Sequence, residues 1–267
     1  MGEDEIMVTI ASAIAALVMW GLWGANRRGM RSDFYPNASI KQLTLIGGIV
    51  NAGLLFMILK LWSSFDVRDS APYLAQYWFM GAAFAAVAGI IISPLMGISH
   101  RDDVCERSNP AAAFAWLGVV AGFTIAYAGS NIGDGPGWWV VVFCTFVAYG
   151  FLLAVWFAFE LAFHIAELVT VERDVAAGMR FGGLMLGLGI VAGRGAAGNW
   201  QGPDNAIADF LSVVVPALPL VVCAAIVELL LRPKAGAEVR QPALFGALPG
   251  LAFTLGGFFY VWLLKPW

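Results

Sequence analysis

Eight long apolar stretches follow one another along this chain, and short polar connections separate them. A helix that spans a bilayer needs about 20 predominantly apolar residues, so the pattern predicts eight transmembrane helices. They lie at about residues 6–25, 40–62, 73–98, 110–130, 138–163, 175–195, 206–231 and 242–264. The connections leave no room for a soluble catalytic domain. We therefore predict an all-α fold, a polytopic membrane helix bundle in which residues 1–267 form a single transmembrane domain.

Composition agrees with a membrane environment. Hydrophobic residues make up 60% of the chain and charged residues 12%, and the mean hydropathy is +0.79. These values lie outside the usual range of soluble domains. Because the pI is near 5.3 and no soluble basic face exists, nucleic acid is excluded as a partner. The lipid bilayer is the expected surrounding.

The distribution of lysine and arginine predicts the orientation, because short cytoplasmic connections of membrane proteins are enriched in these residues. Eleven of the 15 basic residues lie in or beside the odd-numbered connections: Arg27, Arg28, Arg31, Lys41, Arg101, Arg107, Arg173, Arg180, Arg232, Lys234 and Arg240. The acidic start, MGEDEIMVTIAS, does not resemble a cleaved signal peptide, so the first helix is expected to stay. We predict that the odd-numbered connections are cytoplasmic and that both termini are external.

The chain repeats one phrase, since RSNPAAAFAWLGVVAG at 107–122 corresponds to ERDVAAGMRFGGLMLG at 172–187. Identical residues recur 65 positions apart, among them Gly118 with Gly183 and Gly122 with Gly187. In a looser copy, QPALFGALPG, the position of Gly250 corresponds to that of Gly118. We predict four helix-pair units in the same orientation, at about 1–62, 73–130, 138–198 and 206–267. Parallel repeats of this kind predict pseudo-symmetry about an axis near the membrane normal.

The repeated phrase combines a helix start with a helix-packing face. Asn109 and Asp174 are the predicted N-caps, whose side chains accept hydrogen bonds from otherwise unpaired backbone N–H groups. Glycines four residues apart let two helix backbones approach closely in lipid. The predicted packing glycines are Gly118, Gly122, Gly183, Gly187, Gly189, Gly193, Gly246 and Gly250.

The segments SNPAAAFAWLGVVAGFTIAYAG and ERDVAAGMRFGGLMLGLGIVAG carry a family resemblance. In each, Asn or Asp precedes a pair of alanines and a helix with regularly spaced glycines. This arrangement resembles the YjfL family of bacterial inner-membrane proteins, an uncharacterised domain family, although this chain carries four apparent units where two are usual. The resemblance implies a small multi-pass protein of the bacterial inner (cytoplasmic) membrane. It implies no catalytic residues.

Ionisable residues near the predicted cytoplasmic helix ends are candidates for a proton or cation path, since such groups are costly inside a membrane. Glu160, His164 and Glu167 have the spacing i, i+4 and i+7, which predicts one helix face. The repeat places four further groups in comparable positions, namely His100, Asp103, Glu228 and Arg180. These seven could converge on one vestibule, with Arg180 as counter-ion. Alternatively, they lie close enough to the helix ends to extend into the interfacial water.

Motifs for chemistry are absent from the sequence. It has no Walker loop, GxSxG, HExxH or CxxCH, and its two histidines lack the spacing of zinc ligands. We therefore predict no enzyme activity, no cofactor and no metal site.

Two functions remain. The first is a non-enzymatic membrane-embedded subunit or scaffold of an envelope complex, present as a homo-oligomer or in a larger assembly. The second is a proton- or cation-conducting channel or transporter, which the predicted kink between Pro216 and Pro219 keeps open.

Overall fold

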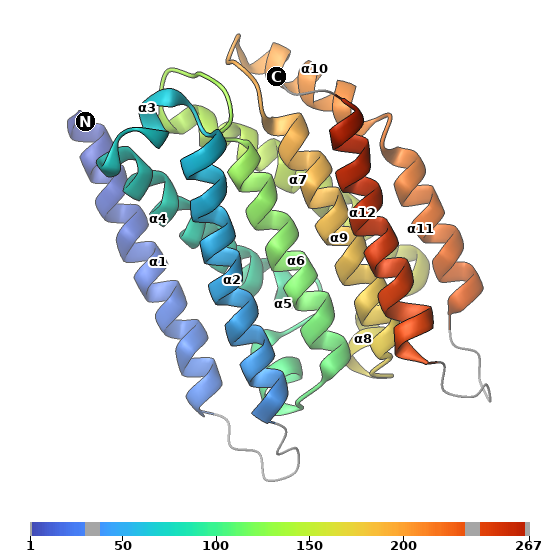
Figure 1. The fold of residues 1–267 in the computed structure, drawn as a ribbon. Helices are drawn as coiled ribbons and strands as arrows, with labels where there is room; N and C mark the ends of the chain where they lie inside the picture. Colours follow the sequence, from blue (N-terminus) through green and yellow to red (C-terminus); the bar gives the residue numbers. More distant parts are fainter. Residues whose placement is uncertain (1, 30–37, 233–240, 265–267) are drawn as a thin grey trace.

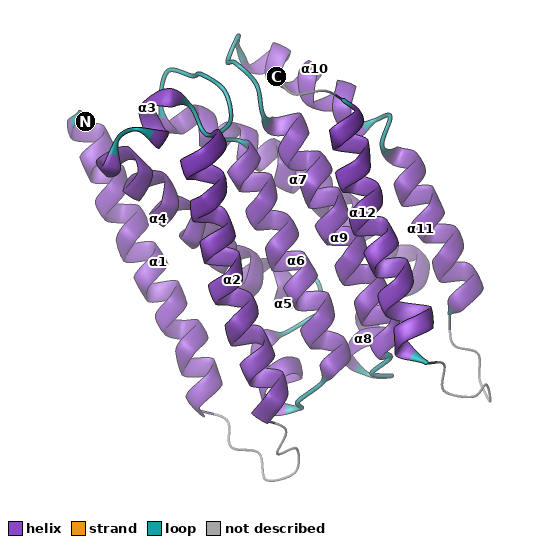
Figure 2. Ribbon diagram, viewed as in Figure 1, coloured by secondary structure: helices purple, strands orange, loops and turns teal. Residues whose placement is uncertain are grey.

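The computed structural model describes residues 2–29, 38–232 and 241–264, and this part of the chain contains helices and no strand (Figure 2). Three segments, η1 to η3, are π-helical. The helices are α1 (Glu3–Gly29), α2 (Ala38–Trp62), α3 (Phe65–Arg68), α4 (Ala71–Val87), η1 (Ala88–Ile92), α5 (Ser93–Leu95), η2 (His100–Glu106), α6 (Pro110–Gly129), α7 (Trp138–Phe163), α8 (Ile165–Thr170), α9 (Val175–Ala196), α10 (Pro203–Val214), α11 (Leu218–Leu231), η3 (Ala243–Ala247) and α12 (Leu248–Leu263).

The helices confirm a polytopic membrane bundle. Within the described ranges, seven spans are long and apolar enough to cross a bilayer, and the pair α10 and α11 supplies an eighth if it is counted as one bent span. The predicted helix at 206–231 is thus two helices, with an angle of 46° between them. Proline cannot donate a backbone hydrogen bond and clashes with the preceding turn, which explains the break at Pro216. Arg31, Lys234 and Arg240 lie outside the described residues.

The long helices are arranged in an open row instead of a ring. Helices α2, α6, α9 and α12 pack successively side by side, and α4, α7 and α11 contact this row (Figure 1). Helix α1 packs against α4, while α2 and α12 lie at opposite ends of the row. The row is open, so the helix-pair units do not close around a central cavity in the described part of the chain. Both ends of the described chain lie at the same end of the bundle, here called the terminal end (Figure 1).

Burial falls from the middle of this arrangement to its edges. In the most apolar 18-residue stretch of each helix, 78% of the residues are buried in α6 and 72% in α9, but only 11% in α1. Large apolar side chains such as Leu17, Leu95 and Leu230 remain exposed by two thirds or more. Such faces suit lipid, which solvates apolar surface as well as a protein core does.

Glycine contacts hold the middle of the row together. A Cβ added at any of the eight predicted packing glycines would meet the backbone of a neighbouring helix. On α9, Gly189 and Gly193 face α6, whereas Gly183 and Gly187 face α12. Helix α9 therefore packs through two glycine faces, one on each side.

Backbone geometry recurs at the predicted offset of 65 residues. Asn109 Oδ1 accepts from the N–H groups of Ala111 and Ala112, at 3.0 and 3.4 Å, and Asp174 Oδ1 accepts from that of Ala176 at 2.9 Å. The residues just before these caps, Ser108 and Arg173, both have positive φ, 47° and 57°. Two loop glycines, Gly133 and Gly198, do so as well. These correspondences support a duplication of the two middle units, while the number of four units stays a prediction.

The contacts of α12 show a register that differs from the predicted one by one residue. Gly178, Gly182 and Gly189 of α9 face Ala111, Phe114 and Gly122 of α6. Gly246, Gly250 and Gly257 of α12 face Ala176, Met179 and Gly187 of α9. Gly250 therefore corresponds to Gly182, 68 positions earlier, and not to Gly183 as the sequence comparison placed it. The contacts between facing helices fix the register directly. The looser sequence match of QPALFGALPG cannot distinguish two registers that differ by one residue.

Candidate functional site

The predicted helix face of Glu160, His164 and Glu167 does not form. Helix α7 ends at Phe163, and His164 adopts the left-handed conformation, with φ 49° and ψ 52°. The Glu160 carboxylate accepts a hydrogen bond of 2.7 Å from the Ala166 N–H, so it caps the short helix α8. His164 and Glu167 are exposed. The left-handed residue turns the chain, and for this reason the i, i+4, i+7 spacing does not describe one continuous face.

His100 lies in an aromatic environment between α1 and α6, and its ring also lies 3.4 Å from the Thr44 hydroxyl of α2. Its side chain is 1% exposed. Trp23 of α1 donates from Nε1 to His100 Nε2 at 3.1 Å, and the Trp116 ring of α6 is 4.5 Å away, centroid to centroid. The Sγ of Cys105 lies 3.8 Å from the ring nitrogens. His100 is thus part of the packed interior, in contact with α1 and α6.

Asp103 is held by its own connection. Its carboxylate accepts from the Ser99 N–H at 2.8 Å and from Arg107 at 3.0 Å. Burial raises the pKa of the Asp103 carboxyl, and this effect exceeds the opposing effects of the Ser99 hydrogen bond and the Arg107 charge. The carboxylate organises the segment that leads to the Asn109 cap.

Arg180 and Glu228 form a buried ion pair between α9 and α11. Arg180 Nε donates to Glu228 Oε2 at 2.7 Å, and a terminal nitrogen donates to Oε1 at 2.8 Å. The other terminal nitrogen donates to the Phe245 carbonyl at 2.8 Å. The arginine is 2% exposed and the glutamate 4%. A bidentate pair of this kind is strong and directional, and it connects α9, α11 and η3.

The structure therefore brings together one pair of the seven ionisable candidates. Glu160 bonds within the α7–α8 corner, His100 packs against α1 and α6, and Arg180 joins Glu228. In the described ranges, no group of three or more His, Cys, Asp or Glu side chains could hold a metal ion. The environment of each candidate depends on side chains far away in the sequence. The alignment of the repeats carries no information about such partners.

A shallow apolar groove crosses the row of helices. It has a volume of about 530 Å³ and receives residues from α2, α6, α9, η3 and α12. Its lining includes Gly47, Gly118, Gly182, Gly183 and Gly250, and Asn51 and Thr254 are its polar side chains. The glycines that allow α6, α9 and α12 to approach also leave their front surface without side chains, which produces the hollow.

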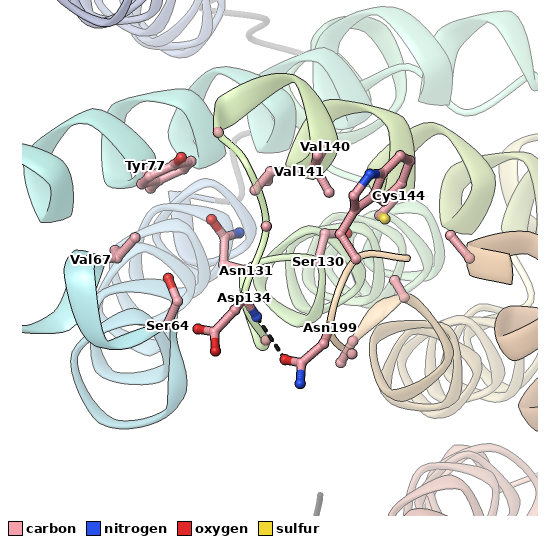
Figure 3. Close-up of a pocket in the computed structure, with 18 of the residues that line it drawn as sticks. Ser64, Val67, Tyr77, Ser130, Asn131, Asp134, Val140, Val141, Cys144 and Asn199 are labelled. Carbon is pink, nitrogen blue, oxygen red and sulfur yellow. Dashed lines mark hydrogen bonds between the residues drawn. The ribbon is translucent and has the colours of Figure 1, made fainter. Parts of the chain in front are cut away.

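A polar pocket lies at the terminal end of the bundle, and none of the candidate residues predicted from the sequence lines it (Figure 3). Two loops, residues 130–137 and 197–202, form one wall. They are joined by hydrogen bonds from Gly198 N–H to the Ile132 carbonyl, at 2.8 Å, and from Asp134 N–H to Asn199 Oδ1, at 2.9 Å. The polar, glycine-rich runs SNIGDGPG and GNWQGPD are the sequence signal that could have indicated it.

The fold and these sites define the class of the molecule, a polytopic α-helical membrane protein. A scan of family models and searches among curated proteins and solved structures return no match for this chain. The resemblance to the YjfL family therefore stays a prediction.

Proposed function

We propose that the chain is a non-enzymatic, membrane-embedded subunit that binds an apolar transmembrane helix of another subunit in the groove across α2, α6, α9 and α12. The groove itself is the observation that carries this proposal. In lipid, helices associate by close packing, and small residues permit the closest approach. A hollow lined by glycines on four neighbouring helices offers this kind of surface.

The contacts at the groove explain why none of the described helices fills it. A Cβ at Gly47 of α2 would meet the side chain of Leu117 on α6. Leu117 stands 65 residues before Gly182 and so occupies a position that glycine holds on α9. Leu117 thus places a side chain between α2 and α6, whereas Gly182 lets α9 meet the backbone of α6. The hollow beside this contact is the space that we assign to a further apolar segment.

The alternative function, a proton or cation path, receives less support from the contacts. Such a path needs the ionisable candidates to face one cavity. The buried ones among them are engaged in pairs or hydrogen bonds in different places. We therefore favour the assembly function over transport.

We further propose that the protein resides in a bacterial inner membrane with both termini external. The basic residues of the odd-numbered connections support this orientation. The two ends of the described chain lie at the same end of the bundle, which agrees with an even number of spans.

Filling the groove tests the proposal. Ala121 and Ala247 line it and are at least partly exposed. We expect Ala121→Trp and Ala247→Trp to abolish co-purification of the partner in mild detergent, because the indole takes the space of the incoming helix. Native mass spectrometry of the purified particle reads the result and tells a second copy of this chain from a different subunit.

The control is Ala158→Trp on the exposed face of α7, outside the groove. It should leave the assembly intact. A wild-type protein that purifies as a monomer, or variants that retain the same assembly as the wild type, would contradict the proposal.

A further inference from the structure

The charged side chains that line the polar pocket at the terminal end are all acidic. Three carboxylates line it, those of Asp66 on α3, Asp134 in the 130–137 loop and Asp209 on α10. None of the described residues that line it is a lysine, an arginine or a histidine. Arg68, the basic residue of α3, lies 3.9 Å from Asp69 and above the Phe65 ring. The lining thus carries negative charge that no lining residue neutralises.

One buried acceptor in this pocket is unsatisfied. Asn131 is 3% exposed, and its Nδ2 donates to the Tyr127 carbonyl at 2.9 Å. Since a carbonyl oxygen can only accept, this bond determines which end of the amide is nitrogen. The Oδ1 atom has no hydrogen-bond partner. A buried amide oxygen without a donor is unfavourable, so this atom is available to accept a hydrogen bond from a ligand.

Asn131 and Asp134 lie in the same loop and line the same pocket. In Figure 3, Asn131 lies between Tyr77 and Asp134, and Ser64 faces the same space. Ser64 N–H donates to the Asn131 carbonyl at 3.1 Å, which fixes the α3 entrance against the loop. Cys144 and Val141 of α7 form an apolar side of the pocket. Two hydroxyl groups, the Asn131 amide and the Asp134 carboxylate therefore line one small space that opens toward the solvent.

We propose that this pocket binds a small nitrogen cation, an ammonium or guanidinium group, with Asn131 Oδ1 and Asp134 as its principal acceptors. The cavity of about 50 Å³ has room for roughly three or four water molecules, which suits a group of this size. A metal ion is disfavoured, because no three carboxylate, thiol or imidazole groups of the described residues gather closely enough to hold one. A cation with several N–H donors can reach acceptors that lie farther apart.

The test uses the full chain in detergent at low ionic strength, titrated with methylguanidinium chloride and with methylammonium chloride in a calorimeter. The wild type should bind at least one of them saturably, at one site per chain. Asp134→Asn keeps the backbone bonds of the loop and removes the charge, and we expect it to weaken binding about tenfold or more. Asp204→Asn is the matched control, since Asp204 is exposed on α10 but does not line the pocket.

Two further arms identify the ligand. Sodium chloride at equal concentration should give no saturable heat, and phosphatidylethanolamine added to the micelles tells a lipid head group from a free cation as the source of the ammonium. Failure of both nitrogen cations and of the lipid to bind would overturn the proposal. Equal binding by the wild type and Asp134→Asn, or equal binding of sodium, would overturn it too.

Discussion

Arg180 and Glu228 are the pair of charges buried most completely in the described structure, and they show how a membrane helix accommodates an ionised group. Removing two charges from water costs several kcal/mol for each. The two bonds between guanidinium and carboxylate, with the third to the Phe245 carbonyl, offset that cost through geometry. Neither partner is accommodated without the other.

This interdependence predicts the effect of mutation. Glu228→Leu leaves a buried guanidinium without its partner and should lower the free energy of unfolding by about 3–5 kcal/mol. The double variant Arg180→Met with Glu228→Leu should recover most of this loss, because no charge stays unpaired. Equilibrium unfolding in detergent, followed by circular dichroism, measures both. If the double variant is as unstable as Glu228→Leu, the unpaired Arg180 charge is not the cause of the lost stability.

At the scale of elements, α9 is the helix on which the row depends, because it contacts α6 through one glycine face and α12 through the other. The same contact scheme is used twice, from α6 to α9 and from α9 to α12. On α12 the positions that follow Gly183 and Gly187 by 68 residues hold Leu251 and Leu255, which are 55% and 54% exposed. Leucine cannot permit so close an approach, and the glycine-packed row ends there.

Glycine substitutions test this packing. A Cβ at Gly189 would meet the backbone of Gly122, so Gly189→Ala forces α6 and α9 apart and should cost about 1–3 kcal/mol of stability. At Gly150 of α7 an added Cβ meets nothing within 4 Å. Gly150→Ala should therefore be neutral or slightly stabilising, through its higher helix propensity. Thermal unfolding in one detergent compares the two, and equal effects would argue against backbone packing at Gly189.

At the scale of the whole molecule, the helix pairs form a two-layered row with both described chain ends on one side (Figure 1). The groove lies on one surface of this row, and the polar pocket opens at the terminal end. The groove and the pocket thus meet different environments, lipid and water, and different ligands suit them.

The orientation predicts labelling from opposite sides of the membrane. In a variant whose three free cysteines are replaced, Asp204→Cys lies at the terminal end and Glu172→Cys lies between α8 and α9, at the opposite end. A membrane-impermeant maleimide applied to spheroplasts should label the cysteine at position 204 alone. The cysteine at position 172 should be labelled only after the membrane is permeabilised. The reverse pattern would contradict external termini, and labelling of both from one side would contradict the number of spans.

The sequence by itself determined the features that depend on local pattern. Bilayer thickness sets the length of an apolar stretch, so the spans could be located, including the bend that Pro216 causes. Asn109 and Asp174 cap N–H groups only two residues further along the chain, so these helix starts could also be predicted from the sequence. The glycine spacing indicated which faces would pack closely, since an interval of four residues repeats on one side of a helix.

The tertiary structure decided everything that depends on partners distant in the chain. Arg180 and Glu228 are 48 residues apart, and Asp134 and Asn199 are 65 apart. No periodicity shows that His164 turns left-handed, that the row stays open, or that the Oδ1 atom of Asn131, a residue of the pocket lining, has no hydrogen-bond partner. Each of these follows from how helices meet, because contact between facing surfaces selects one register and one neighbour among several that a local pattern permits equally.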